Sequence, residues 1–309
     1  MSLKLSTLAL LALPLAIPAQ QTLHLDTHLV TIALNVTSND GAPIPNLTAS
    51  DFELTEDNHP QRIVFFDQPS TTPLDIVLAI DASESVAPYE RLERAAARDF
   101  IHSLLRPQDR IALITFADST HTLVVFTNNP SRIDTALGHI RHGHATALYD
   151  ALTAASQRLA DTPASPNTRR VIVLITDGEN TTHHGSYASA LRAAQRAGAT
   201  IYSLIIIPVA ADAGRDTGGE HALMQLATDT GGKFYNIHQQ SDLAPAFANV
   251  STDLRTQYDL GYYAPQPNTA QFSNDAPQLR HIHLQLRNPT LRAQYTLRYR
   301  TAYDATPQP

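Results

Sequence analysis

The sequence of 309 residues contains no cysteine. This absence excludes disulfide bonds, thiol chemistry, cysteine-based zinc sites and a lipid anchor attached to cysteine. The chain must therefore rely on its core, and on any metal that it binds, for stability. Positive charge is also in deficit: 22 Lys and Arg face 29 Asp and Glu, which gives a formal net charge of −7. A negative chain without a basic stripe repels phosphate, so we expect no nucleic-acid partner.

Long apolar runs are equally scarce, because only the segment from Leu5 to Ile17 is almost entirely apolar. Lys4 precedes this run, and Ala19 followed by Gln20 marks a cleavage point, so residues 1–19 have the pattern of a secretory signal peptide. A short membrane anchor is the alternative, but the run is too short to span a bilayer comfortably. We therefore expect an exported protein, periplasmic or secreted, whose mature chain has no transmembrane segment.

The common catalytic signatures are missing as well. The chain has no Gly-x-Ser-x-Gly elbow, no His-Glu-x-x-His and no phosphate-binding Walker loop. Apart from histidines in loops, no residue is placed as a general base. We therefore expect that the protein is not an enzyme, and a metal-dependent hydrolase is the least favoured alternative.

What the sequence does contain, between residues 73 and 257, is an alternation of short apolar runs with segments of helical periodicity. The expected strands are 75–80, 110–116, 121–126, 170–176, 200–207 and 233–237. The expected helices are 90–105, 146–159, 186–197, 223–230 and 241–255. This alternation predicts an α/β fold with a mostly parallel sheet and helices on both faces. Segment 121–126 follows its predecessor after a short turn, so we expect it to be antiparallel and at an edge.

The two ends of the chain have a different pattern, with apolar residues at every second position. Strands are expected within 29–36, 52–54 and 62–66, and again within 258–263, 280–286 and 294–300. Neither end has enough strands for a stable core of its own. We therefore predict that residues 22–70 and 258–303 pair into one small all-β, sandwich-like domain, with the α/β domain of residues 73–257 inserted between them.

Five oxygen-bearing side chains follow the predicted strands or precede a predicted helix. Asp81, Ser83 and Ser85 form an Asp-x-Ser-x-Ser sequence after the strand 75–80, Asp177 follows the strand 170–176, and Thr146 precedes a helix. Each piece alone is a common turn or cap. Together they lie at the carboxyl ends of parallel strands, where ligands bind in open α/β sheets. The sequence therefore predicts a metal site made of oxygen ligands.

The chemistry of these ligands selects the metal. Magnesium prefers oxygen ligands in near-octahedral geometry, manganese and calcium also fit, and zinc and copper prefer nitrogen or sulfur. The two carboxylates of Asp81 and Asp177 would only neutralise a divalent ion. The hydroxyls are neutral and leave the ion electrophilic, so a carboxylate from an Asp or Glu of a protein partner could complete its coordination.

This arrangement closely resembles the metal-ion-dependent adhesion site (MIDAS) of von Willebrand factor A-type (VWA) domains, over roughly residues 73–255. The resemblance implies a Rossmann-like sheet with one antiparallel edge strand. It also implies that Ser83 and Ser85 bind the ion directly, and that Asp81, Thr146 and Asp177 bind it directly or through water. The flanks, with Leu-Thr-Ala-Ser-Asp-Phe-Glu-Leu and Leu-Gly-Tyr-Tyr, resemble a bacterial group of exported VWA-related proteins. One departure is the His-Ala pair before the threonine, where many relatives have a glycine-rich turn.

The leading hypothesis is therefore an exported metal-dependent protein-binding module. In the main alternative, the protein is a structural scaffold of an envelope assembly in which the ion only stabilises the fold. Four histidines, His142, His144, His183 and His184, are expected near the site, either as solvated loop residues or as a source of pH-dependent binding. The polar segment 209–221 lies at the same rim, as a specificity loop or as disordered surface.

Overall fold

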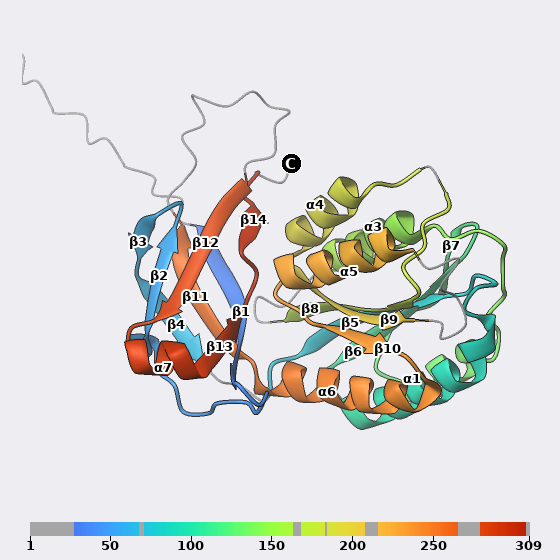
Figure 1. The fold of residues 1–309 in the computed structure, drawn as a ribbon, viewed down its shortest axis with the longest axis horizontal. Coiled ribbons are helices and arrows are strands. Elements are labelled where there is room, and N and C mark those ends of the chain that lie inside the picture. The colour runs from blue at the N-terminus through green and yellow to red at the C-terminus, as the bar shows by residue number, and fades with distance from the viewer. Residues whose placement is uncertain are drawn as a thin grey trace, which may run out of the picture.

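The computed structural model describes residues 28–67, 71–162, 168–182, 184–207, 216–264 and 279–306. The expected signal peptide, His183 and most of the polar segment 209–221 lie outside these residues. Figure 1 shows a central sheet covered by helices on both faces, beside a smaller unit of antiparallel strands. No helix in the described part of the chain is long and apolar enough to cross a membrane.

The central sheet has six strands in the order β10-β9-β8-β5-β6-β7. The strands are β5 (Leu74–Asp81), β6 (Arg110–Phe116), β7 (Thr120–Thr127), β8 (Arg169–Thr176), β9 (Ala199–Ile206) and β10 (Phe234–Ile237). All neighbours are parallel except β6 and β7, which are antiparallel. Every residue of β5 is buried, as expected for a strand covered on both faces. The predicted fold, with one antiparallel edge strand, is confirmed.

Six helices cover this sheet. They are α1 (Glu90–Leu104), α2 (Pro130–Leu137), α3 (Leu148–Ala160), α4 (Tyr187–Ala197), α5 (Thr217–Asp229) and α6 (Leu243–Thr256). The apolar stripes of α1, α2 and α6 pack on one face, and those of α3, α4 and α5 on the other (Figure 1). The sequence did not indicate α2, which is short, and α5 begins six residues before the expected start because its first turn is polar and rich in glycine.

The flanks form two further antiparallel sheets, and each sheet contains strands from both ends of the chain. The first, in the order β13-β1-β11-β4, joins β1 (His28–Ser38) and β4 (Ile63–Asp67) to β11 (Tyr258–Ala264) and β13 (Tyr295–Arg298). The second, in the order β14-β12-β2-β3, joins β2 (Phe52–Glu56) and β3 (His59–Gln61) to β12 (Leu279–Leu286) and β14 (Ala302–Asp304). Inward-facing residues of both sheets share one core, and α7 (Pro289–Gln294) closes one side of it.

A buried polar junction connects the sandwich to the α/β unit. Arg169, at the start of β8, donates from Nε and Nη2 to the two carboxylate oxygens of Asp259 on β11, at 2.9 Å each. Its remaining donors reach the carbonyl oxygens of Leu254 at 2.8 Å and Gln257 at 3.0 Å. The side-chain amide of Gln257 donates in turn to Asn35 Oδ1 of β1 at 2.9 Å. The α/β unit is therefore held against the flanking strands by charge-assisted hydrogen bonds as well as by the chain itself.

Candidate metal centre

The candidate site lies on three loops at the carboxyl edge of the sheet. Asp81 is the last residue of β5, and Asp177 follows β8, the strand next to it. Thr146 lies on the loop before α3. The backbone N–H of Thr146 donates to Thr181 Oγ1 at 2.7 Å, and its carbonyl oxygen accepts from the N–H of Thr181 at 3.0 Å. The loop after β8 is therefore bound directly to the loop before α3.

The third loop contains the Asp-x-Ser-x-Ser sequence. The carbonyl oxygen of Ala82 accepts from the N–H of Gly143 at 3.0 Å, and Ser83 forms a parallel bridge with the same glycine. A Cβ atom at Gly143 would lie 2.8 Å from Ala117 Cβ and 2.4 Å from Asp118 Oδ2, so glycine favours the close approach of this loop to the turn after β6. The structure thus brings all five predicted residues onto loops that are hydrogen-bonded to one another, and their role as metal ligands stays a prediction.

Asp81 is the most buried carboxylate among the predicted ligands, with 2% of its surface exposed. Burial raises its pKa to about 6, and the negative charge of Asp177 acts in the same direction. Two hydrogen bonds oppose this shift: Thr176 Oγ1 donates to Oδ2 at 2.5 Å, and the N–H of Ser83 donates to Oδ1 at 2.8 Å. The carboxylate is therefore held in one orientation at the base of the site.

The two serines lie in different environments. Ser83 is buried, whereas Ser85 is exposed. Their hydroxyl oxygens are 3.0 Å apart, a separation at which both can contact a single ion. Ser85 is therefore the predicted ligand that is open to solvent and to a partner.

Asp177 is held by a tight turn. Its Oδ1 accepts from the N–H of Glu179 at 3.2 Å. Gly178 between them has φ +92°, and a Cβ there would lie 3.0 Å from the backbone nitrogen of Glu220 on α5. This turn requires glycine both for its left-handed backbone and for its contact with α5. The Asp-Gly pair after β8 therefore places the second carboxylate beside the start of α5.

Three residues that shape this site were not singled out by the sequence. Thr176 orients Asp81 through the bond described above. Asp118 accepts from the backbone N–H of Ala145 at 2.8 Å and of His144 at 3.4 Å, and so supports the loop that carries Thr146. This support supplies the loop geometry at the position where many relatives have glycines.

The third residue that shapes the site is Glu93 on α1. Its side chain is buried, with 2% exposed, and its Oε1 has no hydrogen-bond partner in the described part of the chain. Burial, together with the negative charges of Asp81 and Asp177, raises the pKa of Glu93 to about 8. Its spacing to Ala96, Ala97 and Phe100 is helical, so an acidic residue on the apolar stripe was the feature that could have revealed it.

The donor set fits a hard divalent cation. It consists of two carboxylates and three hydroxyls, all oxygen, and a third buried carboxyl group interacts electrostatically with both carboxylates. Over the described ranges, no group of three or more His, Cys, Asp or Glu side chains is arranged to hold a metal. A nitrogen-rich zinc centre is therefore not formed by this part of the chain.

Two of the loop histidines lie close to exposed or half-buried carboxylates. His142 Nε2 lies 2.8 Å from Glu90 Oε2, and His144 Nδ1 lies 2.7 Å from Glu84 Oε1. His144 and His184 are exposed. Glu84 lies between the two serines, so His144 is adjacent to the candidate site.

Comparison with known proteins gives the family. The sequence pattern of the von Willebrand factor type A domain matches residues 75–249, and no curated protein sequence matches the chain. Proximal thread matrix protein 1 from the mussel byssus is 18% identical, with a TM-score of 0.51 over 65% of this chain and 51% of that chain. Another structure of the mussel protein has zinc in its MIDAS motif.

Two bacterial structures are also similar. The pilus adhesin SpaC from Lactobacillus rhamnosus GG, in an open conformation, is 13% identical, with a TM-score of 0.50 over 82% of this chain and 47% of that chain. An aerotolerance-related membrane protein from Bacteroides fragilis NCTC 9343 is 23% identical, with a TM-score of 0.45 over 59% of this chain and 98% of that chain. At these identities the likeness shows the fold alone. The family pattern, however, covers more than half of the sequence, and the chain belongs to the von Willebrand factor type A domain family.

Proposed function

We propose that the protein is an exported, metal-dependent binding module and not an enzyme. A divalent cation, Mg²⁺ foremost, is held by Asp81, Ser83, Ser85, Thr146 and Asp177 and accepts a carboxylate from an Asp or Glu of a partner protein. The observation that carries the proposal is the meeting of these residues on three hydrogen-bonded loops at the carboxyl edge of the sheet. VWA domains are commonly metal-dependent interaction modules, and they are typically not enzymes.

Charge explains why such an ion would seek a partner. The two carboxylates only just neutralise the charge of a divalent ion, and the neutral hydroxyls add no negative charge. The ion therefore still attracts one further anionic ligand. Mn²⁺ and Ca²⁺ fit the same oxygen donors. The zinc in the MIDAS motif of the mussel protein adds Zn²⁺ to the ions worth testing.

The raised pKa of Asp81 makes metal binding depend on pH. An ion binds the ionised carboxylate, so it must displace the proton that burial favours below about pH 6. We expect the metal affinity to fall as the pH drops below this value, by up to about tenfold for each pH unit.

Export is proposed from the chain itself, through the apolar run that follows Lys4. The byssus protein and the pilus adhesin, which share the fold, are consistent with this location. Membership of the exported bacterial VWA-related group is part of the same proposal.

Calorimetric titration of the chelator-stripped protein with Mg²⁺ and Mn²⁺ tests the site. We expect saturable binding at one site, its loss in Asp81→Ala, and an affinity at least about tenfold lower in Ser85→Ala. Ser85 is exposed, so its replacement should leave the fold intact. Glu84→Gln is the matched control, because Glu84 is exposed and lies between the two serines without being a predicted ligand.

Failure of the wild-type protein to bind either ion would contradict the metal site. If the wild-type protein does bind an ion, Thr146→Ala distinguishes the partner-binding hypothesis from the scaffold hypothesis. Loss of partner binding without loss of thermal stability supports recognition, whereas loss of stability with partner binding retained supports the scaffold alternative. The folded state of each variant is checked by circular dichroism.

A further inference from the structure

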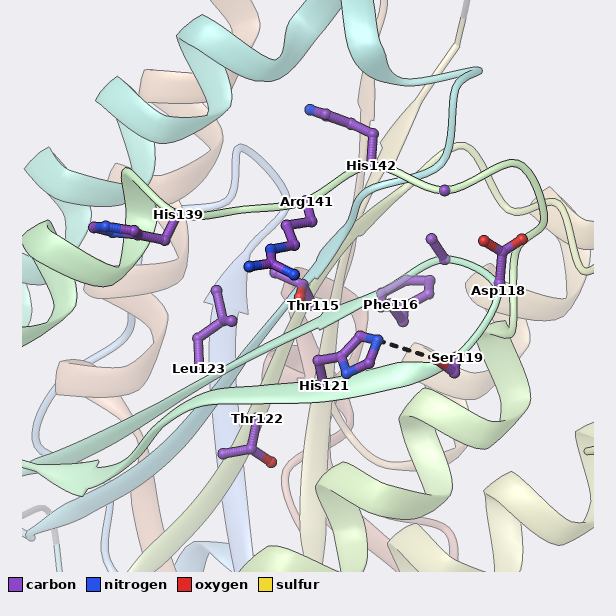
Figure 2. Close-up of a pocket in the computed structure, with 12 residues that line it drawn as sticks. Thr115, Phe116, Asp118, Ser119, His121, Thr122, Leu123, His139, Arg141 and His142 are labelled. Carbon is purple, nitrogen blue, oxygen red and sulfur yellow. Dashed lines mark hydrogen bonds between the residues drawn. The ribbon is translucent and has the colours of Figure 1, made fainter.

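A pocket of about 530 Å³ lies beside the candidate metal site. Figure 2 shows it between the β6–β7 hairpin and the loop of residues 139–143 that precedes the Thr146 turn. His121 is on β7 and faces this loop, and the Arg141 side chain reaches from the loop toward Thr115 of β6. The pocket is therefore open at the same rim of the sheet as the five predicted ligands.

The pocket and the metal site share a wall. Gly143 lines the pocket and also donates its N–H to Ala82, inside the Asp-x-Ser-x-Ser loop. Asp118 lines the pocket and also holds the turn before Thr146. A ligand that fills the pocket is therefore adjacent to whatever completes the metal coordination.

The pocket lining combines one arginine with three histidines. They are Arg141, His121, His139 and His142, whose side-chain nitrogens can donate hydrogen bonds to an anion. Within the described residues, Arg141 is exposed and forms no ion pair. The single carboxylate of the lining, Asp118, has both oxygens occupied by the backbone N–H groups of His144 and Ala145. Asp118 is thus oriented toward backbone donors, and Arg141 forms no ion pair with it or with another carboxylate of the described residues, so the guanidinium is available to an incoming anion.

A second arginine lies further along the edge of the sheet. A neighbouring cavity of about 590 Å³ shares Leu123 and His139 with the first and adds Arg132 of α2. It lies beside β7, which is the edge strand of the central sheet. An acidic segment that extends from the metal site along this edge would therefore meet Arg141 and then Arg132.

We propose that this pocket binds a second carboxylate of the same partner segment, so that the partner presents two acidic side chains close together in sequence. The first carboxylate completes the metal coordination, and this part rests on the proposed function. The second forms a charge-assisted contact with Arg141, supported by His121 and His139. The partner is thereby specified more narrowly than by one acidic residue: it has a short acidic segment, not a lone Asp or Glu.

The test uses two fluorescent peptides that differ in one residue: Ser-Asp-Ala-Asp-Ser and Ser-Asp-Ala-Asn-Ser. Their binding to the metal-loaded full chain is measured by anisotropy, with and without chelator. We expect Arg141→Gln to weaken the first peptide by about fivefold and to leave the second unchanged. The control, Lys233→Gln, removes an exposed positive charge next to β10, at the opposite edge of the sheet, and should change neither.

The outcomes separate the two proposals. Equal affinity of the two peptides for the wild-type protein, or an equal effect of Arg141→Gln on both, overturns the second-carboxylate pocket. In a further outcome, chelator has no effect on binding, and Arg141→Gln weakens the first peptide alone. This result supports the second-carboxylate pocket and contradicts the metal-bound carboxylate. No binding of either peptide at millimolar concentration overturns both.

Discussion

Replacing Arg169 by methionine is expected to destabilise the protein by about 3–5 kcal/mol. Arg169 is 8% exposed, and its ion pair with Asp259 has both carboxylate oxygens engaged at 2.9 Å. Thr72 Oγ1 also donates to Asp259 Oδ2, at 3.1 Å. Methionine fills much of the same volume but leaves the buried carboxylate with Thr72 as its remaining side-chain donor, and it leaves two carbonyl oxygens without the guanidinium donors. The cost comes from these unpaired groups and not from lost packing.

Urea denaturation monitored by circular dichroism measures this loss. Arg287→Met is the control, because the Arg287–Glu53 pair is exposed and should contribute at most about 1 kcal/mol. The double variant Arg169→Met/Asp259→Leu should recover much of the stability, since no charge is then left unpaired. A single-variant loss below about 1 kcal/mol would show that water reaches this junction and replaces the missing donors.

The junction also shows where sequence reasoning stops. The fold class followed from strand patterns, because a continuous apolar run such as residues 76–80 is typical of a strand buried between two helical layers. The pairing of β1 with β11 and β13 joins segments more than 200 residues apart in the chain. Each flank has too few strands for a core of its own, which predicted that the two flanks pair. The register of the paired strands depends on tertiary contacts that no local sequence pattern contains.

The same division applies to the candidate site. Its five predicted residues were visible because each stands at the end of a strand or before a helix. Asp118 and Thr176 were not visible, because their roles depend on backbone N–H groups and on a carboxylate that come close only in the folded chain. The short helices α2 and α7 were missed for a different reason: each begins at the proline of an Asn-Pro pair and is too short for a clear period.

Glu93 is the case in which the folded environment changes the chemistry of a residue most. Its pKa of about 8 lies far above its usual 4.5. Between these two values the folded protein keeps a proton that the unfolded chain has released. The free energy of unfolding of the metal-free protein therefore falls as the pH rises from about 4.5 to about 8, and this contribution is constant outside that window.

Glu93→Gln should remove this dependence, because glutamine stays neutral and close to the shape of the protonated acid. We expect wild type and variant to be about equally stable below pH 4.5. Above pH 8 the variant should be more stable by on the order of 3–5 kcal/mol. Urea denaturation in the presence of chelator, at a series of pH values, measures the difference. The control is Asp99→Asn, which changes an exposed carboxylate on the same helix and should alter the free energy of unfolding by at most about 0.5 kcal/mol.

Metal then tests whether Glu93 belongs to the site. A divalent cation bound by Asp81 and Asp177 would favour the ionised form of Glu93, so saturating Mg²⁺ should reduce the stability advantage of Glu93→Gln above pH 8. If the advantage persists unchanged with Mg²⁺ although the ion binds, Glu93 lies outside the electrostatic reach of the ion. If there is no advantage at any pH, the buried carboxyl is solvated in solution, and its unpaired oxygen is satisfied by water.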